Sequence, residues 1–214
     1  MLYFLTKLLL RCFFSLTGGV KARGLSNVQK EGPLIIVSNH QSILDPLVIM
    51  AFIPRKLRFI AAAYLFRIPG LNILLRLYGA IPVNDAKRGD VSSLKKALRT
   101  LKKGGAVALF PEGGVSVDGK LRPFKPGFAY LALKSGAQVL PVAIRGTKDV
   151  LPVGKYLPRR GRIELIMGKA ISVEKKGKIS ETEKRIFAET SKKIEESIRA
   201  LLFCKFEEVN YVKN

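Results

Sequence analysis

His40 and Asp45 are the residues of this sequence whose types and spacing are best suited to acid–base chemistry. His40 is the only histidine in the chain, and Asp45 follows it five positions later. Imidazole exchanges a proton near neutral pH, and a carboxylate on its second ring nitrogen fixes the tautomer and stabilises the imidazolium. In the alternative interpretation, Asp45 caps a helix and His40 is a loop residue bonded to the backbone. Taken alone, the two residues favour that alternative, because single histidines and Asp-Pro pairs are common.

The neighbouring residues predict where this pair lies in a fold. Leu34–Val37 is a short apolar run typical of a buried strand, and a polar stretch follows it through His40. Asp45 and Pro46 form a helix-start signal in which the aspartate caps and the proline takes the first helical position. We expect that helix to run to about Ile53. His40 is therefore expected just beyond the carboxyl end of a strand, where open α/β sheets place their ligand crevices.

A second polar loop follows another predicted strand, Ala106–Phe110. Glu112 comes directly after it, and Gly113 and Gly114 allow the backbone to approach a ligand closely. Two cations within reach of a bound anion follow in the same loop: Arg122 and Lys125. We expect this loop to open on the same edge of the sheet as His40. In the alternative interpretation, Glu112 is a turn carboxylate satisfied by backbone amides.

Strands alternate with helices along the rest of the chain, which predicts an α/β fold with a largely parallel central sheet flanked by helices. Further strands are expected at Lys56–Ala63, Ala80–Val83, Val139–Arg145 and, as an edge strand, Arg162–Met167. Further helices are expected at Asp90–Lys103, Phe128–Ser135 and Ser180–Leu202. Tyr64–Tyr78 is apolar and broken by Pro69-Gly70, so it is either more core or a second surface that dips into lipid.

Two of these helices carry terminal signals. Asp90 caps the first, and Ser180 with Glu183 forms a capping box at the start of the last. The expected buried stripe of the first helix is Val91, Leu94, Leu98 and Leu101. Its outer face carries Lys95, Lys96, Arg99, Lys102 and Lys103, which we interpret as a solvated face that adds to the basic field.

The composition predicts one globular domain with an anionic partner. The 214 residues include 38 Lys and Arg against 16 Asp and Glu, a net charge of +22. That balance indicates nucleic acid, a membrane surface or phosphorylated substrates. Cys12 and Cys204 form neither a disulfide framework nor a zinc spacing. A single histidine excludes a His-rich metal site, so no metal is expected.

The first residues of the chain, Met1–Leu16, are very hydrophobic apart from Lys7 and Arg11. A membrane-spanning helix needs about 20 apolar residues, and this stretch is shorter and charged near its middle. We predict an amphipathic helix in the membrane interface, with both cations reaching up to the headgroups. The alternative is a helix docked on the protein's own core.

Four motifs that occur in a fixed order favour the chemical interpretations of His40 and Glu112 over the alternatives. Asn39-His40 with Asp45-Pro46 (an HX4D motif) is followed by Phe110–Gly113 (FPEG), then Lys125–Phe128, then Leu140–Val142. This set resembles the glycerolipid acyltransferase family, typified by bacterial 1-acyl-glycerol-3-phosphate acyltransferases. The resemblance covers about residues 33–146.

The resemblance implies roles for the motif residues. His40 is then the general base and Asp45 its orienting partner, and Pro141 belongs to the acyl-donor side. The substrate-binding group comprises Asn39, Glu112, Gly113, Gly114, Arg122 and Lys125. No cofactor is implied beyond acyl-CoA or acyl-carrier protein as co-substrate.

This sequence departs from the family pattern at two places associated with the acceptor phosphate. The family usually continues FPEG with Thr-Arg-Ser, whereas Gly114, Val115 and Ser116 stand here. It also usually places an arginine shortly after the strand equivalent to Gly79–Val83, where Asn84 and Asp85 follow. Either the acceptor differs, or other cations hold its phosphate: Arg88, Arg122 or Lys125.

We therefore expect residues 1–20 to be a membrane-associating helix and 21–214 a single acyltransferase domain. Its expected reaction moves a fatty acyl group from acyl-CoA or acyl-carrier protein to a lysophospholipid hydroxyl. The leading acceptor is 1-acyl-glycerol-3-phosphate, at the cytoplasmic face of the plasma (inner) membrane with its anionic lipid. Alternatives are another lysolipid acceptor, or a non-catalytic basic protein that binds lipid or nucleic acid. Against nucleic acid, the aromatic residues do not interleave with the basic ones.

Overall fold

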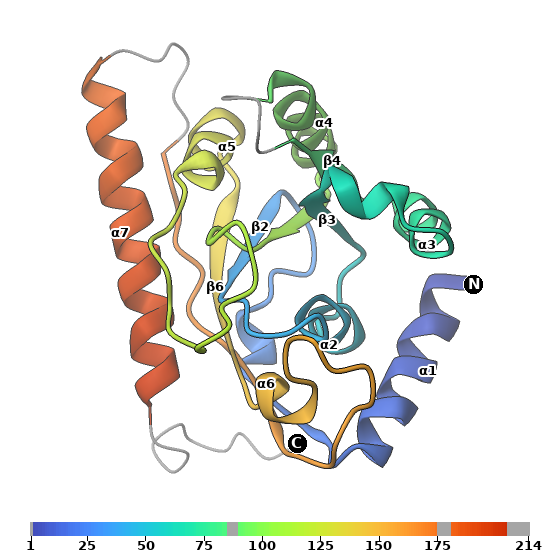
Figure 1. Ribbon diagram of the computed structural model, residues 1–214. Coiled ribbons are helices and arrows are strands. Elements are labelled where there is room, and N and C mark those ends of the chain that lie inside the picture. Colours follow the sequence, from blue (N-terminus) through green and yellow to red (C-terminus); the bar gives the residue numbers. More distant parts are fainter. Residues whose placement is uncertain (1, 85–89, 175–180, 205–214) are drawn as a thin grey trace.

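A central sheet organises the structure, a computed structural model that describes residues 2–84, 90–174 and 181–204; within these it has seven strands (Figure 1). They are β1 (Val20–Arg23), β2 (Leu34–Ser38), β3 (Leu57–Ala62), β4 (Ile81–Val83), β5 (Ala106–Leu109), β6 (Gln138–Arg145) and β7 (Ile163–Met167). Their order is β1-β7-β6-β2-β5-β3-β4, and among these strand pairs only β6 and β7 run antiparallel. The predicted α/β fold with a largely parallel central sheet is confirmed.

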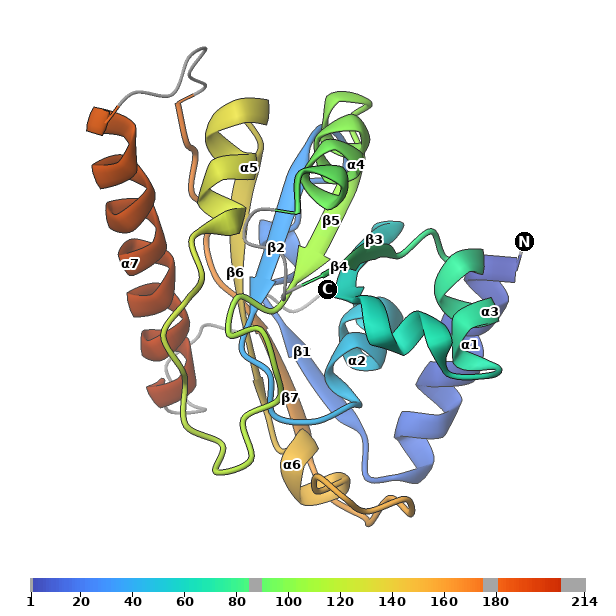
Figure 2. The same cartoon turned by 45° about the horizontal axis from the view of Figure 1, so that its top comes forward.

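Helices cover both faces of the sheet (Figure 2). One face packs against α1 (Leu2–Leu16) and α2 (Asp45–Phe52), which contribute Phe14 and Val48 to its core. The other face packs against α4 (Val91–Lys102), α5 (Gly127–Ser135) and α7 (Glu181–Phe203), through Ala97, Phe128 and Ile194. The remaining helices are η1 (Leu25–Asn27), η2 (Ala63–Arg67), α3 (Leu71–Leu77) and α6 (Thr147–Val150).

Strand β2 lies in the middle of the sheet and determines where the two polar loops meet. All five of its residues are buried, as its apolar sequence predicts. It pairs in parallel with β5 on one side and β6 on the other, with Val37 opposite both Leu109 and Pro141. Because β2 and β5 are parallel neighbours, the loops after them open at the same edge of the sheet.

The outermost strand on one side of the sheet is not the strand that was predicted. Val20–Arg23 was not predicted as a strand, but it is β1, which pairs in parallel with β7 and forms the edge itself. The prediction that Arg162–Met167 is an edge strand is therefore wrong, because β7 lies between β1 and β6. Charged residues such as Lys21 and Arg23 are compatible with an edge strand. They alternate with Val20 and Ala22, but four residues are too few for the alternation to identify a strand.

The helix α4 begins as predicted but packs on a rotated face. The Asp90 carboxylate accepts hydrogen bonds from the N–H groups of Ser92 and Ser93, at 3.1 and 3.2 Å. Val91 is 57% exposed and Ala97 is buried, so the predicted stripe is wrong at its first residue. The small side chains facing the sheet let α4 approach it closely. The predicted capping box lies outside the described part of the chain, which includes neither Ser180 nor the side chain of Glu183.

Helix α1 is docked on α2, and both of its cations bond the end of that helix, although Arg11 is itself exposed. The Lys7 ammonium donates to the carbonyl of Ile53, and Arg11 Nε donates to that of Ala51 at 3.0 Å. These carbonyls belong to the end of α2, where backbone acceptors lack helical donors and the helix dipole is negative. The prediction that Lys7 and Arg11 reach up to the headgroups is therefore wrong.

The outward face of α1 is apolar instead. It exposes Leu2, Phe4, Leu5, Leu8, Leu9 and Leu16, with Phe4 78% exposed. Helix α3 lies on the same side of the molecule (Figure 1 and Figure 2) and exposes Ile73 and Leu77. Within residues 2–84, 90–174 and 181–204, no helix combines the length and the hydropathy needed to cross a bilayer.

Candidate active site

The carboxylate of Asp45 folds back onto the ring of His40. Asp45 Oδ2 lies 2.8 Å from His40 Nδ1 and also accepts the N–H groups of Gln41 and Ser42, at 2.6 and 2.8 Å. Asp45 is fully buried, and the imidazole is 15% exposed. A carboxylate held by two backbone donors fixes the proton on Nδ1, which leaves Nε2 as the nitrogen that accepts a proton.

This geometry corrects the predicted cap. The N-cap of α2 is Leu44, and Asp45 stands in the first helical turn. Its side chain therefore bonds the loop in front of the helix rather than the helix itself. The turn from His40 to Ser42 wraps around the carboxylate, which brings the two side chains together although they are five residues apart.

Phe110 forms one wall of the site. Its ring is stacked on the imidazole of His40, with centroids 4.0 Å apart and planes inclined by 16°. Phe110 follows β5 directly, so the parallel pairing of β2 and β5 creates this contact. Phe110 was not among the predicted site residues, although its place at the end of a strand beside the Glu112 loop was a usable signal.

Glu112 ties the two loops together through backbone groups. Its Oε1 accepts the N–H of His40 at 2.8 Å, and its Oε2 accepts the N–H of Arg122 at 3.0 Å. Ser116 N–H adds a bond to the carbonyl of His40 at 2.8 Å. Burial raises the pKa of Glu112 above its ordinary value, while these backbone donors and the charges of His40 and Arg122 oppose the shift. This arrangement matches the alternative interpretation of Glu112, a carboxylate satisfied by amides.

The glycines next to Glu112 have different surroundings. Gly113 has a φ of 76°, and a β-carbon there would lie 2.4 Å from Lys125 Nζ. The positive φ favours glycine at this position, and the Lys125 side chain lies over it. A β-carbon at Gly114 would meet open space. The side chains of Arg122 and Lys125 are exposed on the same loop, beside Glu112.

Asn39 and Pro141, two residues of the predicted site, hydrogen-bond backbone groups of the protein itself. Asn39 is 2% exposed and uses its whole amide on Ile144, donating at 2.9 Å and accepting at 2.8 Å. Its expected contact with substrate is therefore not supported. Pro141 is buried in β6, and its carbonyl accepts the N–H of Gly168 at 2.9 Å. Arg88 lies outside the described residues.

Comparison with known proteins identifies the family. The family profile described as Acyltransferase matches residues 19–145, which include both polar loops. The chain belongs to this acyltransferase family. The crystal structure of the 1-acyl-sn-glycerophosphate (LPA) acyltransferase PlsC from Thermotoga maritima is similar, with a TM-score of 0.75 and 30% identity. The match covers 96% of this chain and 81% of that one.

Curated relatives of this chain carry similar names. A chloroplastic 1-acyl-sn-glycerol-3-phosphate acyltransferase (BAT2) of Brassica napus is 34% identical over 152 residues, 70% of this chain and 44% of that protein. The 1-acyl-sn-glycerol-3-phosphate acyltransferase of Borreliella burgdorferi is 34% identical over 127 residues, 59% of this chain and 51% of that protein. The chain thus spans about half the length of these relatives. Among its described residues, no cluster of three His, Cys, Asp or Glu is arranged to hold a metal ion.

Proposed function

We propose that this protein is a membrane-bound O-acyltransferase that converts 1-acyl-glycerol-3-phosphate to phosphatidic acid. The acyl donor is a thioester of coenzyme A or of acyl-carrier protein, used at the cytoplasmic face of the plasma (inner) membrane. The observation that carries the proposal is the 2.8 Å contact between His40 Nδ1 and the buried Asp45 carboxylate, inside the region that the family profile matches. The names of the relatives supply the acceptor.

The chemistry follows from the orientation of the imidazole. His40 Nε2 accepts the proton of the acceptor hydroxyl while that oxygen attacks the thioester carbonyl. Asp45 accepts the Nδ1–H bond and stabilises the imidazolium that forms. When the tetrahedral intermediate collapses, the carbon–sulfur bond breaks and the thiolate takes the proton from Nε2. The products are an ester and a free thiol, and no covalent acyl-enzyme is involved.

Backbone amides of the Glu112 loop are candidates to stabilise the oxyanion of that intermediate. The N–H of Gly113 is already bonded to the carbonyl of Phe110 at 3.2 Å. The next two N–H groups, of Gly114 and Val115, have no hydrogen bond recorded in the described part of the chain. The open space at Gly114 leaves room for a substrate to approach them.

Arg122 and Lys125 are the described residues best placed for the acceptor phosphate. Both are exposed on the loop that Glu112 bonds to the backbone of His40. They would replace the arginines that the family usually carries elsewhere. Because Lys125 lies over Gly113, a phosphate bound by it would be close to the loop amides.

The outward face of α1 supports membrane contact. Its large apolar side chains are exposed, and the neighbouring α3 adds Ile73 and Leu77 to the same side of the molecule. Exposed apolar surface of this extent is typical of a protein or membrane interaction site. With its cations bonded to α2, the helix presents a face that inserts into the acyl-chain boundary of a bilayer.

An acyl-transfer assay with purified protein tests the proposal. Acyl-CoA and acyl-carrier protein are each offered with 1-acyl-glycerol-3-phosphate, other lysophospholipids and glycerol 3-phosphate. We expect transfer to 1-acyl-glycerol-3-phosphate, and His40→Ala to reduce it by about 10²–10⁴-fold. If only another lysolipid is acylated, that lysolipid replaces 1-acyl-glycerol-3-phosphate as the acceptor. A His40→Ala variant with near-wild-type activity, or no transfer from either donor, would refute the acyltransferase mechanism.

A further inference from the structure

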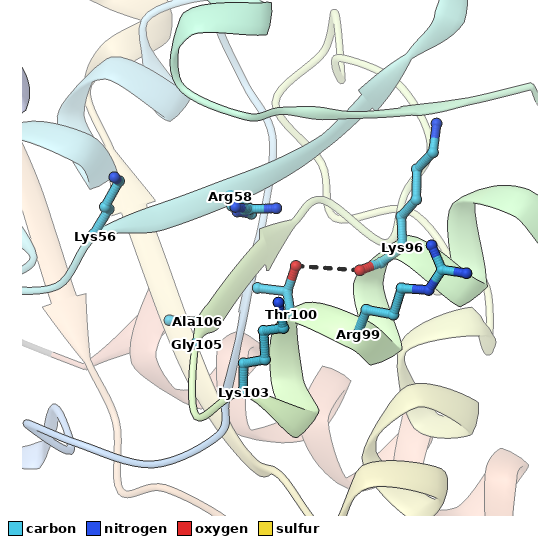
Figure 3. A pocket seen from close by; sticks show the side chains of 8 residues that line it. All are labelled: Lys56, Arg58, Lys96, Arg99, Thr100, Lys103, Gly105 and Ala106. Carbon is cyan, nitrogen blue, oxygen red and sulfur yellow. Dashed lines mark hydrogen bonds between the residues drawn. The ribbon is translucent and has the colours of Figure 1, made fainter.

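A basic groove lies between β3 and α4, at the opposite edge of the sheet from His40 (Figure 3). Its volume is about 430 Å³, and it is lined by Lys56, Arg58, Lys96, Arg99, Thr100, Lys103, Gly105 and Ala106. Ala106 begins β5, whereas Phe110 follows the end of that strand and contacts His40. The groove is therefore separate from the catalytic site and from the Glu112 loop.

The five cations of the groove come from two elements. Lys96, Arg99 and Lys103 lie on one face of α4 and its C-cap, and Lys56 and Arg58 lie at the start of β3 (Figure 3). The lining contains no carboxylate. Within the described part of the chain, none of these five side chains has a recorded ion pair or hydrogen bond. Like charges brought together without counter-charges repel, and a bound anion relieves that repulsion.

The groove borders the apolar surface of α1 and α3. The Tyr3 hydroxyl of α1 bonds the backbone of Arg55 and Leu57, the two neighbours of Lys56. The turn after α3 lies against Arg58, since a β-carbon at Gly79 would be 3.4 Å from its Nε. A bilayer that contacts α1 and α3 thus has its headgroup layer beside these cations.

We propose that the groove binds the phosphate headgroups of anionic phospholipids in the bilayer against which α1 and α3 lie. The proposal rests on the membrane contact proposed above and adds a defined headgroup site to it. Guanidinium groups bind phosphate oxygens in a bidentate fork and lysines bind them as point charges. A cavity of this volume is large enough for a headgroup. Apolar insertion and headgroup binding at adjacent surfaces would fix the orientation of the protein on the membrane.

Binding to lipid vesicles tests the proposal with a matched pair of variants. Arg58→Gln/Arg99→Gln removes two charges from the groove, and Lys95→Gln/Lys102→Gln removes two from exposed positions of α4 outside it. Co-sedimentation uses vesicles of phosphatidylcholine alone and vesicles that also contain phosphatidylglycerol. We expect the groove variant to bind the phosphatidylglycerol vesicles about 30-fold more weakly and the control variant less than about threefold more weakly. Binding to phosphatidylcholine should be unchanged.

Three results would overturn the proposal. Equal weakening of vesicle binding by both variants would indicate a diffuse charge effect without a defined site. Unchanged binding by the groove variant would exclude the groove as a headgroup site. Wild-type protein that binds both vesicle types equally would exclude anionic headgroups. A titration with free coenzyme A provides a further arm. Loss of coenzyme A binding in the groove variant, with vesicle binding retained, would assign the groove to the donor nucleotide instead.

The vesicle measurement contains neither acyl donor nor acceptor, so it is independent of catalysis. If the acyl-transfer assay fails while the groove variant loses phosphatidylglycerol binding, only the proposed reaction is wrong. If transfer depends on His40 in detergent while the groove variant binds vesicles normally, only the groove is wrong. Thermal unfolding of both variants checks that they are folded.

Discussion

The imidazole of His40 is held from three directions by residues of two loops. Asp45 contacts its Nδ1, Phe110 stacks on its face, and Glu112 accepts the hydrogen bond of its backbone N–H. Of these three, only Asp45 bonds the ring itself. The other two residues position it, so their substitution should change catalysis by a different route from loss of the base itself.

Glu112→Gln is predicted to lower kcat while leaving KM for the acceptor nearly unchanged. An amide has one acceptor oxygen, so the N–H of either His40 or Arg122 loses its partner. A buried unpaired donor costs about 1–3 kcal/mol, which should appear as a lower free energy of unfolding. Steady-state kinetics with varied acceptor, together with denaturant unfolding, measure both effects.

Glu164→Gln provides the control for loss of a partly buried carboxylate. Glu164 lies on β7, paired with Arg145 at 3.3 Å and away from His40. Its substitution should leave both kinetic constants unchanged. If Glu112→Gln instead raises KM for the acceptor with kcat unchanged, Glu112 contacts the acceptor as the family resemblance implies.

At the scale of elements, α1 is oriented opposite to an amphipathic helix on a water-exposed surface, because its apolar side chains face outward. Its cations are bonded to the end of α2, and its leucines and Phe4 face outward. Phe14 is fully buried in the core, so removal of the whole helix would uncover the sheet face beneath it. Point substitutions are therefore the appropriate test of membrane contact.

Phe4→Ser/Leu9→Ser should weaken binding to phosphatidylcholine vesicles by at least about a hundredfold. Burial of each large apolar side chain contributes about 1.5–3 kcal/mol, or about tenfold or more per residue. Both side chains are exposed in the free protein, so the free energy of unfolding should change by less than about 0.5 kcal/mol. Vesicle co-sedimentation and denaturant unfolding give the two values.

Arg11→Leu is the complementary variant at the contact of the same helix with α2. It removes the bond to Ala51 and the contact with the ring of Phe52, so it should lower the free energy of unfolding by about 1.5–3 kcal/mol. Vesicle binding by the folded variant should remain. The opposite pattern would mean that α1 rotates to present its cations to the membrane.

Asp90→Ala is predicted to lower the free energy of unfolding by about 1 kcal/mol at neutral pH, through loss of the cap of α4. The Ser93 hydroxyl and the N–H of Asn84 lower the pKa of Asp90. The stabilisation is therefore present above the ordinary aspartate pKa of about 3.9 and is lost as pH falls through the lower folded value. Unfolding at several pH values should show the two proteins converging in acid, and Asp90→Asn should retain the cap. A difference independent of pH would contradict this account.

At the scale of the whole molecule, the net charge of +22 acts alongside the apolar surface. In the proposed membrane contact, the charge would draw the protein toward anionic lipid over a range set by ionic strength. The apolar side chains of α1 and α3 act only on contact. Salt screens the contribution of the charge but not that of the apolar side chains, so the two can be measured separately.

Wild-type binding to phosphatidylglycerol vesicles should fall with salt until it matches binding to phosphatidylcholine vesicles. Raising the ionic strength from about 0.1 M to about 1 M shortens the Debye length from about 10 Å to about 3 Å. Binding to phosphatidylcholine should persist, since salt does not weaken apolar burial. Co-sedimentation across this range measures both, and complete release at high salt would mean that the apolar face does not insert.

Local signals in the sequence determined most of the elements and the pairing of His40 with Asp45. Apolar runs predicted β2 and β5, the Asp90 signal predicted the start of α4, and strand–helix alternation predicted the parallel sheet. Because consecutive parallel strands end at one edge, the same information placed His40 and Glu112 together. These features depend on residues close in sequence, for which pattern and chemistry are sufficient.

Only the tertiary structure decided what those residues contact. Asn39 was expected at the substrate but bonds Ile144, more than a hundred residues away. For Glu112 both a substrate contact and backbone amides were open, and it bonds the amides of His40 and Arg122. Lys7 carries no sequence signal for the direction in which it points. Its direction depends on the free carbonyls at the end of α2, which α1 meets only after the chain folds. The physical reason is that a polar atom takes the partner that burial leaves unsatisfied, and folding alone determines which partner that is.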